Sequence, residues 1–204
     1  MLGKVTPELS ALLANTDRVT LLSGPSGAGK STLMRAIRTD PDVQASFGLT
    51  DRPSWIVDPG LWEGLYDSRT RSMFLTYNHN RVWIRNIGEY SDDEILHAVR
   101  QSNELVVVTI WDEPEILLRR ANTRIRSTLG KIVSFKYRTM KHLYRLRVQL
   151  KLRSLYQNPD QVWRQYRRWL TFCDEHGVSK HWSLRGKDSS EMTPMTDNGR
   201  PFWE

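Results

Sequence analysis

The residues best suited to chemistry form a glycine-rich segment between an apolar run and a helical one. It consists of Gly24, Pro25, Ser26, Gly27, Ala28, Gly29, Lys30 and Ser31, and it matches the phosphate-binding pattern G-x-x-x-x-G-K-[ST] in full. Glycines let the backbone curl so that successive N–H groups point at phosphate oxygens, and the following helix adds its positive N-terminal end. The pattern predicts that Lys30 reaches the outer phosphates, that the Ser31 hydroxyl binds Mg²⁺ and that Thr32 contacts the inner phosphate. The alternative is an ordinary glycine turn into a helix.

The elements around this segment indicate an α/β protein. Hydrophobic patterns predict strands at 18–24, 54–60, 81–89, 104–112 and 179–184, and helices at 5–14, 31–39, 61–80, 91–102, 113–127, 131–156 and 161–175. Strands that alternate with helices are typical of right-handed βαβ units, and we expect a three-layer fold with a parallel sheet between helices. A single domain is predicted over residues 1–184. Residues 185–204 are rich in Gly, Ser, Pro and Asp, and they are predicted to form a loosely ordered tail.

Acidic side chains follow several of the predicted strands. Ligands of open parallel sheets bind beyond the carboxyl ends of the strands, where the sequence has Asp58, Glu89, Asp112 and Glu113. Glu89 is predicted to assist Mg²⁺ through water. The third predicted strand has Asn86 where an ATPase motor has an aspartate for the metal. The sequence therefore does not identify a second protein ligand for Mg²⁺, and an ATPase motor is disfavoured.

The overall composition excludes several classes of protein. The 204 residues are 39% hydrophobic and 26% charged, which is typical of a soluble globular domain. No apolar run approaches the roughly 18 residues of a membrane span, and the N-terminus lacks the features of a secretory signal. The single cysteine, Cys173, cannot form an internal disulfide. We therefore expect a cytoplasmic protein without a membrane partner, in the host cytoplasm if the source is a virus.

Positive charge is concentrated in one quarter of the chain. Residues 119–169 contain 15 Lys and Arg but one acidic residue, Asp160, whereas the remainder has 15 basic and 22 acidic residues. Such a patch suits a polyanion or a group of nucleotide phosphates. The alternative is a solvated basic helical face.

Apolar and aromatic residues recur at helical spacing in this basic quarter. One stripe, most simply part of the core, comprises Val133, Tyr137, Met140, Tyr144, Val148, Leu152 and Leu155. A second stripe comprises Trp163, Tyr166 and Trp169, with arginines between them. Aromatic residues beside arginines can stack on bases and bind phosphates, although such stripes are more often core.

The segment GPSGAGKSTL resembles the phosphate loop of guanylate kinase and of the wider group of nucleoside and nucleotide kinases. The later segment ELVVVTIWDEPEILLRRANTR resembles the strand, proline and helix that lead into the arginine-bearing lid of such kinases. The resemblance implies ATP and Mg²⁺ as cofactors and a catalytic base at Asp58. It also places Arg119, Arg120, Arg124 and Arg126 in a lid, with Arg120 and Arg124 as the preferred catalytic pair. The guanylate-binding segments are not visible, so the resemblance covers the ATP side only.

The acceptor of the phosphate follows from the basic quarter. A nucleic acid explains so many cations better than a free nucleotide does. This compact basic chain is similar to phage 5-hydroxymethyluracil DNA kinases, which phosphorylate the hydroxymethyl group of the base. That similarity implies DNA as a partner and an extruded base received by Trp55, Trp62 or Trp83. The alternatives are a small-molecule nucleoside or nucleotide kinase and, from another class, a nucleic-acid-binding P-loop ATPase.

Overall fold

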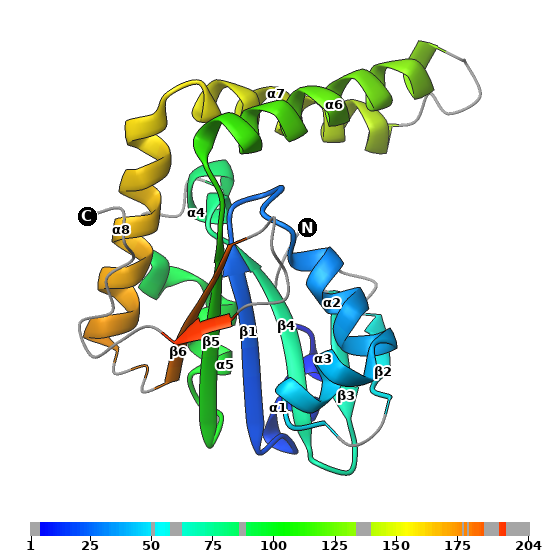
Figure 1. The fold of residues 1–204 in the computed structure, drawn as a ribbon, viewed down its shortest axis with the longest axis vertical. Coiled ribbons are helices and arrows are strands. Elements are labelled where there is room, and N and C mark those ends of the chain that lie inside the picture. The colour runs from blue at the N-terminus through cyan, green and yellow to red at the C-terminus, as the bar shows by residue number, and fades with distance from the viewer. Residues whose placement is uncertain are drawn as a thin grey trace.

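The computed structural model describes residues 5–49, 52–57, 63–85, 89–133, 140–176, 178, 180–185 and 192–194 (Figure 1). The helices are α1 (Pro7–Ala14), α2 (Lys30–Thr39), α3 (Pro41–Ser46), α4 (Asn80–Arg85), α5 (Glu94–Val99), α6 (Pro114–Val133), α7 (Met140–Tyr156) and α8 (Pro159–Glu175), with a short 3₁₀ helix η1 (Tyr90–Asp92). The strands are β1 (Arg18–Gly24), β2 (Ser54–Val57), β3 (Glu63–Asp67), β4 (Ser72–Asn78), β5 (Glu104–Trp111), β6 (Lys180–Arg185) and β7 (Met192–Pro194).

These strands form one mixed sheet in the order β2-β3-β4-β1-β5-β6-β7. Its centre is parallel, because β1 pairs with β4 and β5, and β5 pairs with β6, all in the same direction. The pairs β2–β3, β3–β4 and β6–β7 are antiparallel. The α/β class predicted from the sequence is confirmed. The predicted parallel sheet is confirmed at the centre and is wrong at both edges, where the pairs are antiparallel.

The strand register brings the functional segments to one edge of the sheet. Gly24, the last residue of β1, lies opposite Asn78, the last residue of β4, and Ser23 lies opposite Thr109 of β5. Parallel strands end at a common edge, so the loop after β1, the start of α4 and the start of α6 meet there. Two successive antiparallel pairs give β2 the same direction as β4, so β2 also ends at this edge.

Each face of the sheet has its own hydrophobic core. One core joins Leu22, Phe74 and Val108 to α2, to the first residues of α6, to the end of α7 and to the start of α8. The other joins Leu21 and Val107 to α1, α5 and the second half of α8. Six of the seven residues of β1 are buried because neighbouring strands flank β1 and helices cover both of its faces. The central strand is thereby a rigid support for the loop that follows it.

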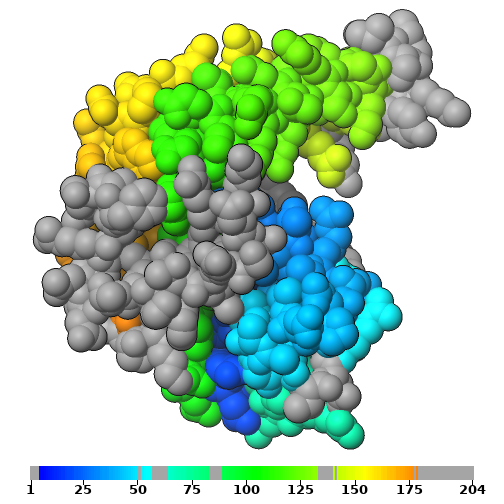
Figure 2. Space-filling view, viewed as in Figure 1, coloured from blue at the N-terminus to red at the C-terminus, as the bar shows by residue number. Residues whose placement is uncertain are grey.

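The two helices α6 and α7 form a hairpin that we call the arm (114–133 and 140–156). The arm extends beyond the body of the molecule above α2, and its outer part is free of the sheet (Figures 1 and 2). The apolar stripe predicted as core is therefore buried only at the base of the arm, at Leu152 and Leu155. Farther out, Met140 is 81% exposed and Tyr144 is 48% exposed. Val133 and Tyr137 fall outside the side chains that the structure describes.

Two predictions on either side of residue 80 are wrong. Residues 63–78, predicted as helix, form the hairpin β3–β4, and residues 81–85, predicted as strand, belong to α4, which begins at Asn80. The turn of the hairpin is stabilised by Asp67, whose carboxylate accepts hydrogen bonds from Arg69 N–H at 3.0 Å and from the Thr70 hydroxyl at 2.7 Å. Arg71 completes the turn in the left-handed region, with φ of 47°.

α3 was not predicted, and the predicted helix at 131–156 begins later, because residues 131–133 end α6 and α7 begins at Met140. The other elements agree with their predicted ranges to within a few residues or extend them. Within the predicted tail, β7 is a departure, because it pairs with β6. Residues 186–191 and 195–204 lie outside the described part of the chain. Among the helices of the described residues, none has the length and hydrophobicity needed to cross a membrane.

Candidate functional site

The glycine-rich loop (residues 24–31) leaves a buried strand and enters α2 through three glycines with positive φ. The φ angles are 147° at Gly24, 113° at Gly29 and 100° at Gly27. At Gly24 a Cβ would lie 2.3 Å from the carbonyl oxygen of Ile110 on β5, so any side chain there would clash with backbone. The loop can therefore turn at the sheet edge only with glycine at this position.

This turn leaves a set of backbone donors open. Within the described chain, the N–H groups of Gly27, Gly29, Lys30 and Ser31 have no hydrogen-bond partner. They lie in the turn and at the N-terminal end of α2, where the helix dipole also favours negative charge. Such an arrangement is suited to bind the oxygens of a phosphate or another anion.

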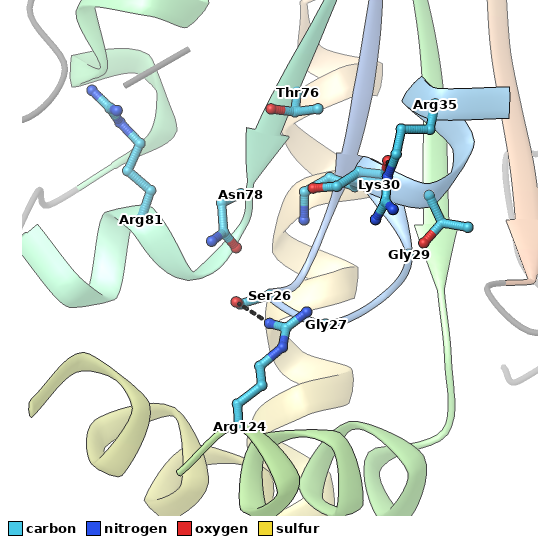
Figure 3. A pocket seen from close by; sticks show the side chains of 11 residues that line it. Ser26, Gly27, Gly29, Lys30, Arg35, Thr76, Asn78, Arg81 and Arg124 are labelled. Atoms are coloured by element: carbon cyan, nitrogen blue, oxygen red, sulfur yellow. Dashed lines mark hydrogen bonds between the residues drawn. The ribbon is translucent and has the colours of Figure 1, made fainter. Parts of the chain in front are cut away.

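A cavity of about 320 Å³ lies beside the loop (Figure 3). The described residues that line it are Ser26, Gly27, Gly29, Lys30, Ser31, Thr32, Arg35, Thr76, Asn78, Arg81 and Arg124. They come from the loop, α2, β4, α4 and α6. Four of them are cationic and none is acidic, so the cavity favours an anionic ligand.

Lys30 is the first residue of α2, and its ammonium group caps the loop. Nζ donates to the carbonyl oxygens of Gly24 and Pro25, both at 2.8 Å. Removal from water and, secondarily, the charge of Arg124 lower the pKa of Lys30 to about 7. An anion in the cavity would favour the charged form and raise this pKa again.

The two arginines preferred from the sequence both contact the glycine-rich loop. Arg120 Nη1 donates to the carbonyl oxygen of Gly27 at 2.7 Å and lies 2.7 Å from Asp112 Oδ2, a fully buried carboxylate. Arg124 Nη1 donates to Ser26 Oγ at 3.3 Å and faces the cavity (Figure 3). Arg120 is thus held in place as a support of the loop, whereas Arg124 is available to a ligand.

The other arginines of the predicted lid, Arg119 and Arg126, are exposed and are not among the residues that line the cavity. They lie on the arm away from the loop contacts of Arg120 and Arg124. Of the four predicted lid arginines, the structure brings only Arg120 and Arg124 to the loop.

The acidic residues predicted at strand ends have different positions. Asp58 and Asn86 lie outside the described residues. Glu89 forms an ion pair with Arg168 at 3.1 Å and does not line the cavity, so its predicted role near Mg²⁺ finds no support. Asp112 is at a strand end as predicted, but its carboxylate pairs with Arg120.

Sequence reasoning missed four residues of the cavity: Arg35, Thr76, Asn78 and Arg81. Three of them belong to β4 and α4, which were assigned to the wrong secondary structure. Once 72–78 is read as an apolar strand, SMFLTYN, the polar residue at its carboxyl end is Asn78 and not Asn86. Arg35 is four residues after Ser31 on α2. This spacing places both residues on one face of the helix, so the sequence could have indicated that Arg35 lies near the loop.

The residues around the cavity fit a magnesium ion through neutral oxygens. The Ser31 hydroxyl lines the cavity, and the buried Oδ1 of Asn78 has no hydrogen-bond partner among the described residues. Hydroxyl and amide oxygens are ligands that hard cations accept, directly or through water. The described chain has no group of three or more His, Cys, Asp or Glu able to hold a metal alone. A bound metal would therefore need ligands from an anionic substrate.

The aromatic residues predicted as base-stacking candidates are mostly core. Tyr166 is 1% exposed and Trp169 is fully buried, with its indole N–H donating to Thr109 Oγ1 at 3.0 Å. Trp163 is half-buried and contacts the ring of Tyr166. Trp55 is half-buried, and the guanidinium of Arg38 lies over its ring at 5.5 Å. Trp62 and the side chain of Trp83 lie outside the described residues.

Two glycines give a matched test of the loop geometry. Gly24→Ala should lower the free energy of unfolding by at least about 1–3 kcal/mol, because the new methyl group meets Ile110 O and the φ angle disfavours alanine. Gly130→Ala, in α6, should raise it by about 1 kcal/mol, because nothing lies within 4 Å of the new methyl group. Urea unfolding monitored by circular dichroism measures both. Equal effects of the two substitutions would contradict the close packing at Gly24.

The lowered pKa of Lys30 predicts a pH-dependent stability. Between about pH 7 and the ordinary value of 10.5, the folded chain holds one proton fewer at this site than the unfolded chain, so its free energy of unfolding rises with pH. Lys30→Met removes this contribution. The stability of the variant relative to the wild type should therefore be greatest near pH 7 and decline towards pH 10, as measured by urea unfolding. Lys151→Met, which removes a lysine from an exposed position away from the cavity, is the control; the same trend in this variant would contradict the assignment to Lys30.

No protein-family model, curated protein or solved structure matches the chain. The interpretation of the site therefore depends on the geometry and charge of its own residues.

Proposed function

We propose that the chain is an ATP- and Mg²⁺-dependent kinase that transfers the γ-phosphate to a hydroxyl group of a nucleic-acid component. The observation that carries this proposal is the combination, around one cavity, of four open backbone N–H groups, Lys30 and three arginines. This combination provides hydrogen-bond donors and positive charge for a chain of phosphates.

On the donor side, the open N–H groups of the glycine-rich loop would bind the inner phosphates, and Lys30 would leave the carbonyl groups of Gly24 and Pro25 to contact the outer ones. Ser31 and Asn78 would hold Mg²⁺ together with the phosphates. When bound, the ion would supply positive charge that offsets the negative charge developing during transfer.

Phosphoryl transfer requires mainly positioning and electrostatic stabilisation, and the arginines can supply both. Arg124 lines the cavity with its guanidinium towards the loop, so it is our candidate for contact with the transferred phosphoryl group. Asp58 remains the proposed base for the acceptor hydroxyl, on the basis of its position after β2, which ends at the same sheet edge as the loop.

The exposed cations support a nucleic-acid acceptor. Seven lie on the described part of the arm, in addition to Arg124: Arg119, Arg126, Lys131, Arg145, Arg147, Lys151 and Arg153. Three more lie on the outer face of α8: Arg164, Arg167 and Arg168. This surface is far larger than one free nucleotide needs. Our specific candidate is the hydroxymethyl group of 5-hydroxymethyluracil in phage DNA, with a nucleoside or nucleotide as the alternative acceptor.

A labelling experiment tests the reaction and its acceptor. The protein is incubated with γ-labelled ATP and Mg²⁺ and, in parallel, with unmodified DNA, DNA containing 5-hydroxymethyluracil, and a panel of nucleosides and monophosphates. We expect label in the modified DNA, and Lys30→Ala should abolish the transfer because it removes the cation that would contact the outer phosphates.

The pattern of label separates the candidate functions. Label in a nucleoside or a monophosphate would select the small-molecule kinase. Release of free phosphate alone, stimulated by nucleic acid, would select the ATPase and contradict both kinases. An active Lys30→Ala variant would contradict the assignment of the donor site.

Two arginines on the same helix distinguish a catalytic contact from a general effect of charge. Arg124→Ala should lower kcat about 10²-fold, because it removes a donor that faces the cavity. Arg119→Ala removes the same charge five residues earlier, at a position that does not line the cavity; it should act on KM for the acceptor and change kcat by less than about twofold. Steady-state kinetics with the labelled acceptor measure both. Similar losses in the two variants would mean that Arg124 acts only through the overall charge of the arm.

A further inference from the structure

The tip of the glycine-rich loop is held by side chains that are distant in the sequence. Each polar group of Ser26 has a partner. Its N–H donates to Asn80 Oδ1 at 2.8 Å, its carbonyl oxygen accepts from the Tyr156 hydroxyl at 2.7 Å, and its Oγ accepts from Arg124 at 3.3 Å. The loop tip is therefore fixed from outside, by α4 and by both helices of the arm.

Tyr156 is the last residue of α7 and lies at the base of the arm. The side chain is almost fully buried, and this burial raises the pKa of Tyr156, so the hydroxyl keeps its proton as a donor. That proton is shared between Ser26 O and Asn80 Oδ1, which lies 2.9 Å from the hydroxyl oxygen. A donor in this position cannot be replaced by water without opening the core around it.

Asn80 connects the same network to α8. Its side chain is fully buried, and its Nδ2 donates to Gln165 Oε1 at 2.7 Å. This bond fixes which end of the amide faces the loop, so that Oδ1 can accept both the Ser26 N–H and the Tyr156 hydroxyl. Tyr156, Asn80 and Ser26 thus form a closed, buried set of hydrogen bonds in which each member orients the other two.

This set decides which backbone groups of the loop stay open. Because the Ser26 N–H is directed to Asn80 and its carbonyl to Tyr156, the next peptide is fixed in orientation, while the N–H groups of Gly27, Gly29, Lys30 and Ser31 keep no partner in the described chain. Donors that are held in place before the ligand arrives stabilise it without the cost of rearrangement.

We infer that Tyr156 and Asn80 are positioning residues of the donor site, which hold the loop in its phosphate-binding form and make the base of the arm part of that site. This inference rests on the proposed function. Tyr156 contacts neither the cavity nor its ligand and acts through the Ser26 carbonyl. A consequence is that a movement of the arm changes the affinity of the loop for its nucleotide.

Tyr156→Phe tests the role, because it removes the hydroxyl and keeps the ring that packs in the core. We expect the affinity for ATP with Mg²⁺, measured by isothermal titration calorimetry, to fall about five- to tenfold. KM for ATP should rise accordingly, while KM for the acceptor changes little. Tyr144→Phe is the matched control: its hydroxyl belongs to a half-exposed tyrosine of the same helix and should leave ATP binding unchanged.

A second variant tests whether Tyr156 and Asn80 act through the same peptide. Asn80→Ala removes the other partner of the Ser26 peptide, and its effect on ATP affinity should combine with that of Tyr156→Phe in a less than additive way, because both act through the same peptide. Additive effects would contradict a shared network. Wild-type affinity in Tyr156→Phe would overturn the inference and leave the kinase proposal intact. If the wild-type protein binds no ATP, the proposed function fails and this role fails with it.

Discussion

The structure depends on a turn that must leave a buried strand while keeping its own N–H groups available. β1 is flanked by β4 and β5, so the chain can leave it only where Gly24 passes the carbonyl group of Ile110 without a side chain. The backbone polar groups that the turn does not offer to a ligand still need partners. These partners are the side chains of Asn80, Arg120 and Tyr156 and the backbone N–H of His79, which donates to Gly24 O. The helices around the loop are therefore arranged as much to satisfy this turn as to cover the sheet.

The charges around the same turn favour an anionic ligand. Lys30, Arg35, Arg81 and Arg124 surround one cavity, and no described residue that lines it is acidic. Two cations have carboxylates nearby, because Arg120 pairs with buried Asp112 and Arg81 with buried Asp93, and these pairs fix their side chains. Lys30 and Arg124, which also line the cavity, repel each other, and this repulsion adds to the effect of burial in lowering the pKa of Lys30. An anionic ligand relieves the repulsion, so the binding of such a ligand also stabilises the loop.

The sequence predicted the loop, β1, β5 and α6 because each has a strong local signal: a full motif, an apolar β-branched run or a proline in the first helical turn. It failed at 63–85, where SRTR and YNHN interrupt the apolar pattern and conceal a hairpin within a single predicted helix. It could not indicate that Tyr156 and Asn80 meet at Ser26, because these contacts join residues 130 and 54 positions apart. It also treated the apolar residues of the arm as core, since periodicity does not reveal whether a second surface covers a helix face.

The polar residue beside the loop decides how a metal ion would enter the proposed kinase. Asn78 ends β4 directly opposite Gly24, and its amide oxygen carries no net charge. The Ser31 hydroxyl is also neutral, and the surrounding cations repel a divalent ion. Attraction for Mg²⁺ therefore has to come from the phosphates, so the ion would arrive as a complex with the nucleotide rather than before it. In this arrangement the protein contributes geometry and positive charge, and the substrate contributes the negative charge that holds the metal.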